Sequence, residues 1–95
     1  MERKFDGFIW DSAKERRNLE KHGVDFVEAA GVFTDPSRKI CTDAKHSAGE
    51  KRYFCVGTVK GRILTVRFLY RGGRIRIFGA GYWRKGRKFY EEKND

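Results

Sequence analysis

The chain has 95 residues, and its 22 Lys and Arg outnumber its 13 Asp and Glu to give a formal net charge of +9. This length predicts one domain, residues 1–95, and no apolar run approaches the roughly 18 residues that a membrane-spanning helix requires. With no signal-peptide pattern either, we expect a soluble, cytoplasmic protein without a membrane partner, whose basic excess favours an anionic partner such as RNA, DNA or an acidic protein.

The first quarter of the chain predicts a short strand followed by a surface helix. Phe8–Trp10 is a brief apolar run typical of an edge strand. Asp11 is a favourable N-cap for a helix that reaches His22 and stops at Gly23. The apolar stripe of this helix amounts to Ala13 and Leu19 alone, so most of the helix should face solvent.

A second helix should begin at Asp25. Its apolar side chains fall at i, i+3, i+4 and i+7, the spacing of one buried helix face, and they are Phe26, Ala29, Ala30 and Phe33. Pro36 prevents its continuation. Residues 34–49 lack periodicity and therefore predict a loop.

Three strand-like runs follow, at about 52–59, 62–70 and 74–80, and two-residue turns at Lys60-Gly61 and Gly72-Gly73 predict that they form a meander. These turns fix the register. One face then carries Tyr53, Cys55, Leu64, Val66, Phe68, Ile75 and Ile77 and should pack on the helices. The other carries Arg52, Phe54, Val56, Thr65, Arg67, Arg74, Arg76 and Phe78. A slip of one residue would exchange the faces of a strand.

After Gly79 and Gly81, the tail from Tyr82 has a helix-like composition that is interrupted by Gly86. The predicted fold is therefore α+β: two N-terminal helices packed on an antiparallel sheet of three to four strands, with a C-terminal helix. Cys41 and Cys55 form no CxxC motif, and we expect both to be reduced thiols, with Cys55 buried.

The arginines of the second sheet face are candidates for binding phosphate, because guanidinium binds phosphate in a bidentate manner. These four are Arg52, Arg67, Arg74 and Arg76. Interleaved aromatic rings could stack on bases. The alternative is a solvated sheet face, with most of the rings in the core.

Internal cleavage of RNA requires a base for the 2′-hydroxyl, an acid for the departing 5′-oxygen and cations at the phosphorus. No metal is obligatory, because the nucleophile belongs to the substrate. The sequence has no dense carboxylate or His/Cys cluster that would suggest metal ligands, so it predicts no metal and no other cofactor.

His46, in the loop before a strand, is a candidate acid or base, although such a histidine can instead bond the backbone. Glu50 could be a base, and the role of arginine partner is favoured. His22 precedes Gly23 and suits a helix C-terminus. Tyr82 and Tyr90 could stack a base or transfer a proton, and packing is the alternative for Tyr90. The catalytic candidates are His46, Glu50, Arg67 and Tyr90; the RNA-binding candidates are Lys21, His22, Lys45, Arg52, Arg74, Arg76, Tyr82, Arg84 and Arg87.

Several motifs together resemble the BrnT family of toxins from bacterial type II toxin–antitoxin pairs. They are Trp10-Asp11, Lys14, the run NLEKHGV at 18–24, FVEA at 26–29, Asp35-Pro36 and HSAGEKR at 46–52. The resemblance covers about residues 8 to 80. It implies a RelE-like fold, a ribonuclease that cleaves mRNA, free or on the ribosome, and growth inhibition until a cognate BrnA-like antitoxin neutralises it. It also implies a heterotetramer with two antitoxin chains, and contact with operator DNA only through the antitoxin.

The sequence departs from the family pattern at its C-terminal end. The family closes its last strand with a run like I-S-A-R, where this chain has Ile77-Phe78-Gly79-Ala80-Gly81, so that glycines replace the serine and the arginine. Gly86-Arg87 stands where the family has Glu-Arg. An alternative function is therefore a catalytically weakened homologue that binds antitoxin or nucleic acid. A third is a nucleic-acid binder that acts alone.

Overall fold

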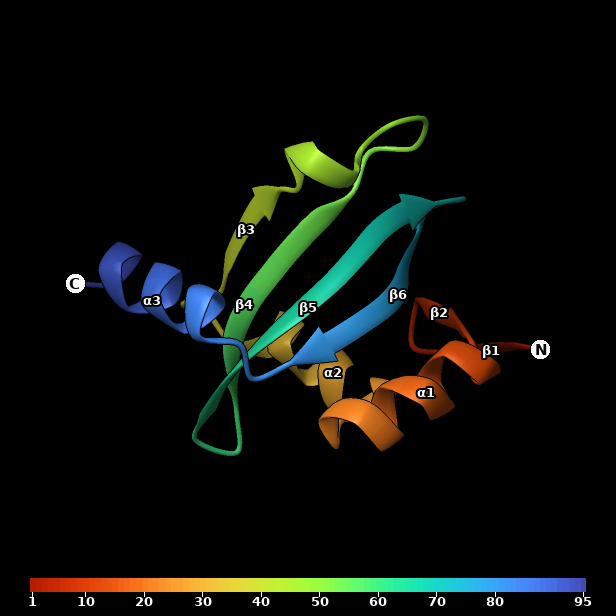
Figure 1. Ribbon diagram of the computed structural model, residues 1–95, viewed down its shortest axis with the longest axis horizontal. Helices are drawn as coiled ribbons and strands as arrows, with labels where there is room; N and C mark the ends of the chain where they lie inside the picture. The colour runs from red at the N-terminus through yellow and green to blue at the C-terminus, as the bar shows by residue number, and fades with distance from the viewer.

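A six-stranded sheet runs diagonally across the molecule in Figure 1, and the computed structural model describes all residues 1–95. The strand order is β1-β2-β6-β5-β4-β3, and every neighbouring pair is antiparallel except β2 and β6. The strands are β1 (Glu2–Phe5), β2 (Phe8–Asp11), β3 (Lys39–Thr42), β4 (Tyr53–Val59), β5 (Arg62–Arg71) and β6 (Arg74–Gly81). The helices are α1 (Ser12–His22), α2 (Phe26–Ala30) and α3 (Arg84–Lys93), with 3₁₀ turns η1 (Gly31–Thr34) and η2 (Ala44–His46).

The predicted meander of β4, β5 and β6 is confirmed. Val59 pairs with Arg62 and Arg71 with Arg74, so each turn contains two residues. All four turn residues have positive φ, from 53° to 77°. This geometry matches the twist of the flanking strands, and it sets the register that separates the two faces of the sheet.

The predicted apolar face forms the core. Cys55, Leu64, Val66, Phe68 and Ile77 are at most 1% exposed, and Tyr53 and Ile75 pack beside them. Residues of the N-terminal half close this core from the other side, namely Trp10, Val24, Phe26, Ala29, Ala30 and Val32. The amphipathic stretch 26–33 thus buries the predicted face, although its last turn tightens from α2 into η1.

A β-bulge in β6 adds one residue opposite β5. Arg67 pairs with Gly79 and Phe68 with Ile77, so Phe78 has no partner of its own. Because side chains alternate along a strand, the extra residue allows both Ile77 and Ala80 to enter the core. Phe78 and Gly79 are both left on the opposite face, which is the face that carries the arginines.

The predicted sheet of three to four antiparallel strands is wrong in its extent and in one pairing. Phe8–Trp10 is not an edge strand, because β1 lies outside it, joined through an Asp6-Gly7 turn with φ of 47° and 85°. Part of the predicted loop 34–49 forms β3, which pairs with β4. β2 runs parallel to β6 through Phe8–Ile75 and Ile9–Arg76, a contact between distant segments.

The first helix begins and ends where the sequence predicts. The Asp11 carboxylate accepts a hydrogen bond from the backbone N–H of Lys14, and Gly23 ends the helix at φ 71°. The predicted apolar stripe is wrong, because Ala13 and Leu19 are exposed. The helix is instead held by a buried amide, that of Asn18. No helix has the length and apolarity needed to cross a membrane.

The Asn18 side chain continues the edge of β6 beyond the point where β2 leaves it. Its Nδ2 donates to the carbonyls of Ala80 (2.9 Å) and Val24 (3.0 Å), and its Oδ1 accepts from the backbone N–H of Ala80 (3.1 Å). Ala80 is fully buried. The amide therefore satisfies backbone groups that water cannot reach.

We predict that Asn18→Ala lowers the free energy of unfolding by about 2–4 kcal/mol, because it leaves both backbone groups of Ala80 buried without partners. Urea denaturation measures this loss. The control is Leu19→Ala at the next position, where an exposed side chain should cost about 0.5 kcal/mol or less. Equal stability of the two variants would contradict the structural role of the amide.

Candidate nucleic-acid interface

Phe78 lies at the centre of the basic face of the sheet. The guanidinium carbon of Arg52 is 4.7 Å from its ring centroid, and that of Arg67 is 5.2 Å away. Both distances fall within the range of cation–π attraction. The bulge that turns Phe78 to this face therefore gathers two of the four predicted phosphate-binding arginines around one ring.

Arg67 carries an uncommitted hydrogen-bond donor. The arginine is half-buried, and its Nε is shielded from water without any hydrogen-bond partner. Gly79 lies opposite, and a Cβ there would be 3.4 Å from the Arg67 Cδ. A buried N–H without a partner costs about 1–3 kcal/mol, so an anionic oxygen would relieve an existing cost if a small shift of the Arg67 side chain let it reach Nε.

A hollow of about 540 Å³ opens beside Arg67, between the sheet and α3. Phe54, Val56 and Thr65 line it from the sheet, Trp83, Gly86 and Phe89 from the C-terminal segment, and Lys45 and Lys85 add positive charge. Gly86 explains the close approach of α3, because any Cβ there would overlap the Thr65 hydroxyl. The second sheet face is therefore not wholly open: Val56 and Thr65 are buried.

A second, shallower groove of about 330 Å³ runs along α1. Lys14, Arg17 and Lys21 line it together with Asn18, and Phe78 belongs to it as well. Arg67 borders the first hollow and contacts Phe78, which borders the groove. The two depressions are thus linked through the Arg67–Phe78 pair.

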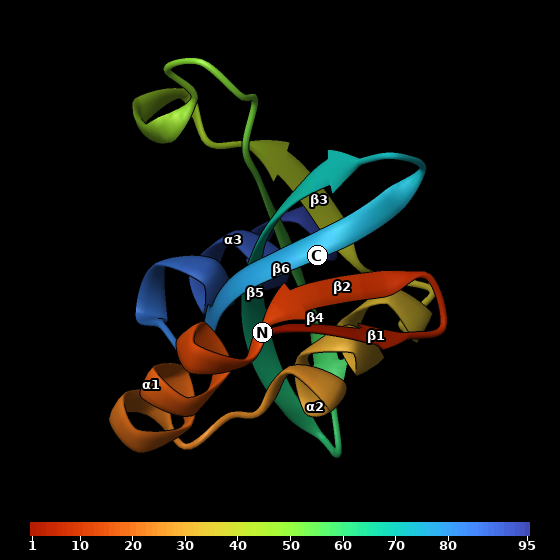
Figure 2. The ribbon, with the colours of Figure 1, turned by 90° about the vertical axis from the view of Figure 1, so that its right-hand side faces the viewer.

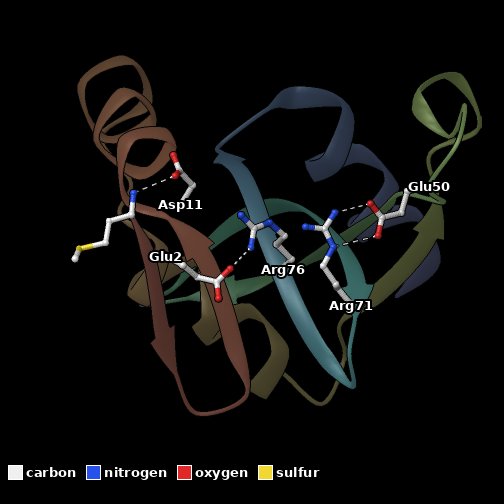
Figure 3. Close-up of polar contacts among 6 residues, drawn as sticks. Glu2, Asp11, Glu50, Arg71 and Arg76 are labelled. Carbon is white, nitrogen blue, oxygen red and sulfur yellow. Dashed lines mark hydrogen bonds and ion pairs between the residues drawn. The ribbon is translucent and has the colours of Figure 1, made fainter.

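The remaining arginines of this face have other surroundings. Arg76 donates to Glu2 of β1 at 2.8 Å, and Arg71 donates twice to Glu50, at 2.6 and 3.3 Å, as Figure 3 shows. The hydrogen bond from Arg71 lowers the pKa of the Glu50 carboxyl. Arg74 is exposed at the turn. Glu50 thus has the arginine partner that the sequence favoured.

His46 lies in η2 with its Nδ1 2.9 Å from Oδ2 of the buried Asp43, and its own ring is half exposed. The hydroxyl of Ser47 donates to the Asp43 carbonyl and accepts from the backbone N–H of Arg52. The His-Ser pair therefore orders the loop that leads into Arg52. Asp43, which the sequence did not single out, is the partner of the histidine.

Tyr90 anchors α3 to Asp35, whose carboxylate also bonds Thr58 near the C-terminal end of β4. The Tyr90 hydroxyl donates to the Asp35 carboxylate at 2.6 Å, which also accepts from the backbone N–H groups of Ser37 and Thr58, each at 2.8 Å. Burial acts to raise the pKa of Asp35, but these bonds outweigh it and lower the pKa to about 2. The bond to Asp35 raises the pKa of Tyr90, whose phenol therefore keeps its proton at neutral pH.

The other predicted RNA-binding residues separate into two groups. Lys45 borders the hollow and Lys21 borders the groove. The ring of His22 packs edge-on against that of Trp83, with 5.3 Å between the ring centroids. Tyr82 donates to Glu28 and lies under the guanidinium of Arg62, Arg87 pairs with Glu91, and Arg84 is exposed. Sequence reasoning missed Lys14, Arg17, Lys85 and Trp83, whose placement depends on how α1 and α3 dock.

We predict that Tyr90→Phe lowers the free energy of unfolding by about 1.5–3 kcal/mol at pH 7, the range for a hydrogen bond to a charged group. The folded pKa of Asp35, about 2, lies below its unfolded value of about 3.9. The stabilisation is therefore complete above about pH 5 and is lost as the pH falls through 2.

The stability difference between the two proteins should accordingly shrink as the pH falls from about 5 to 2, as measured by urea denaturation across pH. Tyr70→Phe, at an exposed tyrosine, is the matched control and should show no such pH-dependent difference. A Tyr90→Phe deficit of the same size at pH 2 and pH 7 would contradict the link to Asp35.

One family matches the sequence, over residues 10–86: the ribonuclease toxin, BrnT, of type II toxin–antitoxin systems. No individual curated protein matches it. The matched region contains α1, the meander and the residues around Phe78. Because the match spans most of its length, this chain belongs to the BrnT family of ribonuclease toxins of type II toxin–antitoxin systems.

Proposed function

We propose that the chain is an endoribonuclease that cleaves mRNA at the Arg67–Phe78 pair, by acid/base chemistry that needs no metal ion. It would act in the cytoplasm, inhibit translation and growth, and be neutralised by a cognate BrnA-like antitoxin, through which alone it would reach operator DNA. The observation that carries the proposal is Arg67, whose buried Nε lacks a partner at the junction of two depressions bordered by cationic side chains.

In the proposed reaction, the 2′-hydroxyl of one nucleotide gives its proton to a base and its oxygen attacks the adjacent phosphorus. The bond to the 5′-oxygen breaks as that oxygen takes a proton from an acid. The products are a 2′,3′-cyclic phosphate and a free 5′-hydroxyl. Negative charge grows on the non-bridging oxygens during this step, and pre-oriented donors stabilise it best. Arg67 and Arg52 would supply those donors, because both guanidiniums are already held against Phe78.

His46 is our candidate for proton transfer. The loop that carries it borders the first hollow through Asp43, Ala44 and Lys45. The contact with Asp43 would orient its ring, as carboxylates do for catalytic histidines. For Glu50 and Tyr90 we propose structural roles, because each is engaged in a contact of its own, with Arg71 and Asp35.

We predict that Arg67→Ala lowers cleavage of labelled mRNA by on the order of 100-fold, the usual effect of removing one pre-oriented donor. Arg67→Lys should fall between, because lysine keeps the charge but not the bidentate geometry. Free mRNA is assayed in EDTA, and a parallel assay with ribosomes contains the Mg²⁺ that ribosomes require. Arg3→Ala, which removes an exposed cation from β1, is the control.

Two results would count against the proposal. One is intact RNA in every assay of the unaltered protein, together with normal growth when it is induced. The other is full activity of Arg67→Ala, which would move the chemistry away from this junction.

A second candidate function, a weakened toxin homologue that keeps antitoxin binding, is favoured by the surroundings of Gly81. The resembling sequences have arginine there. In this chain a Cβ at position 81 would lie 2.6–2.9 Å from three atoms of the Trp83 indole. An arginine can therefore enter only if the indole moves.

The test of this candidate is the double variant Gly81→Arg/Trp83→Ala, compared with Trp83→Ala alone. If the chain has lost a catalytic arginine, the double variant should gain RNA cleavage over the single variant. Equal cleavage by the two would leave the first function as the better account.

A further inference from the structure

We propose that the hollow beneath α3 binds one unpaired nucleobase and that the groove along α1 binds the phosphate of a neighbouring nucleotide. This inference rests on the proposed function and extends it. It makes the substrate a single strand that is gripped on both sides of Arg67, with one base inspected next to the cleaved bond.

The first argument is the chemistry of the hollow. Three aromatic side chains and a valine line it, namely Phe54, Trp83, Phe89 and Val56. Aromatic side chains stack on unpaired bases, whereas bases in a duplex are already covered on both faces. Its volume of about 540 Å³ lies in the range of small-ligand pockets, about 300–1,000 Å³.

The second argument is that the Trp83 ring is fixed in place. One side of the indole lies over Gly81, where no side chain intervenes, and the ring of His22 packs against it at 86°. A ring that is already held loses little conformational freedom when a base stacks on it. Thr65 also lines the hollow, and its buried hydroxyl has no hydrogen-bond partner.

The third argument is the arrangement of charge. Lys45, Lys85 and Arg67 border the aromatic hollow, which places cations where the phosphates of an inserted nucleotide would be. Lys14, Arg17 and Lys21 occur at i, i+3 and i+7 of α1, and therefore lie on one face of that helix, along the groove. An acidic peptide would satisfy these cations but not the aromatic hollow.

The continuity of the two depressions gives the order of the contacts. The hollow ends at Arg67, Arg67 contacts Phe78, and Phe78 borders the groove. A strand that crosses this junction would place a base on one side of Arg67 and a phosphate on the other. Cleavage should therefore prefer particular bases at one position beside the cut.

The test uses tetranucleotides with 2′-O-methyl riboses, which have no free 2′-hydroxyl and so cannot be cleaved by the proposed route. Four homotetramers are compared with an abasic tetramer that carries the same phosphates. Binding is followed by tryptophan fluorescence, for which Trp83 is half-buried and Trp10 is only 3% exposed. At least one homotetramer should quench Trp83 and bind roughly 10-fold more tightly than the abasic tetramer.

Variants separate the two contacts. Binding to the Trp83 variants is measured by titration calorimetry, because they lack the reporting indole. Trp83→Phe should abolish the quenching but retain base-dependent binding, and Trp83→Ala should remove the preference over the abasic tetramer. Arg17→Ala should weaken all five oligonucleotides alike and lessen their salt dependence. Arg3→Ala, which lines neither depression, is the control. Circular dichroism of each variant verifies that it is folded.

Equal affinity for the abasic and base-containing tetramers, or quenching that persists in Trp83→Phe, would overturn the base pocket. Binding unaffected by Arg17→Ala would overturn the groove. If natural RNA is still cleaved in those cases, the proposed function stands without this inference. If the tetramers bind as expected but natural RNA stays intact, the base pocket stands and cleavage is overturned.

Discussion

The side-chain amide of Asn18 is the contact on which the rest of the molecule depends. β2 pairs with β6 at only two positions, and the chain then turns into α1. Without a partner, the next backbone groups of β6 would be buried and unsatisfied, and the amide meets both groups of Ala80. The same contact holds α1 against β6, so it also decides where the cations of that helix lie. The same amide therefore satisfies the otherwise unpaired edge of β6 and positions the helix whose cations line the basic groove.

The bulge at Phe78 determines which side chains of β6 enter the core and which lie on the basic face. The extra residue lets Ile77 and Ala80 both reach the core, and it turns an aromatic ring toward two guanidiniums on the other side. Gly79 and Gly81 then keep that side uncrowded, one beside Arg67 and the other beneath Trp83. Gly81 thus leaves room for the Trp83 indole, which lines the hollow.

The meander could be predicted from the sequence because its turns are local and its alternation is strong. The same holds for the caps of α1, where Asp11 and Gly23 act within one helical turn. The hairpin of β1 and β2 has a comparable local signal in Asp6-Gly7, a two-residue turn in which both residues have positive φ. β3 has almost no sequence signal, because it is only four residues long and lies at the edge of the sheet. The parallel contact of β2 with β6 joins segments more than sixty residues apart, which periodicity does not report.

In the candidate site too, residues placed by local strand alternation could be predicted, whereas residues placed by contacts between distant segments could not. Strand alternation predicts the shared face of Arg52 and Arg67, whereas Trp83, Lys14 and Arg17 join the candidate site only through the docking of the helices. The structural role of Tyr90 could not be predicted from the sequence, because its partner, Asp35, is 55 positions away. Asp35 also ends η1, and Val32 of η1 is in the core. η1 directly follows α2, which Figures 1 and 2 label. Through this one carboxylate, α3, which lines the hollow, is tied to the core, so a shift of the core at Val32 would also move α3 and change the width of the hollow.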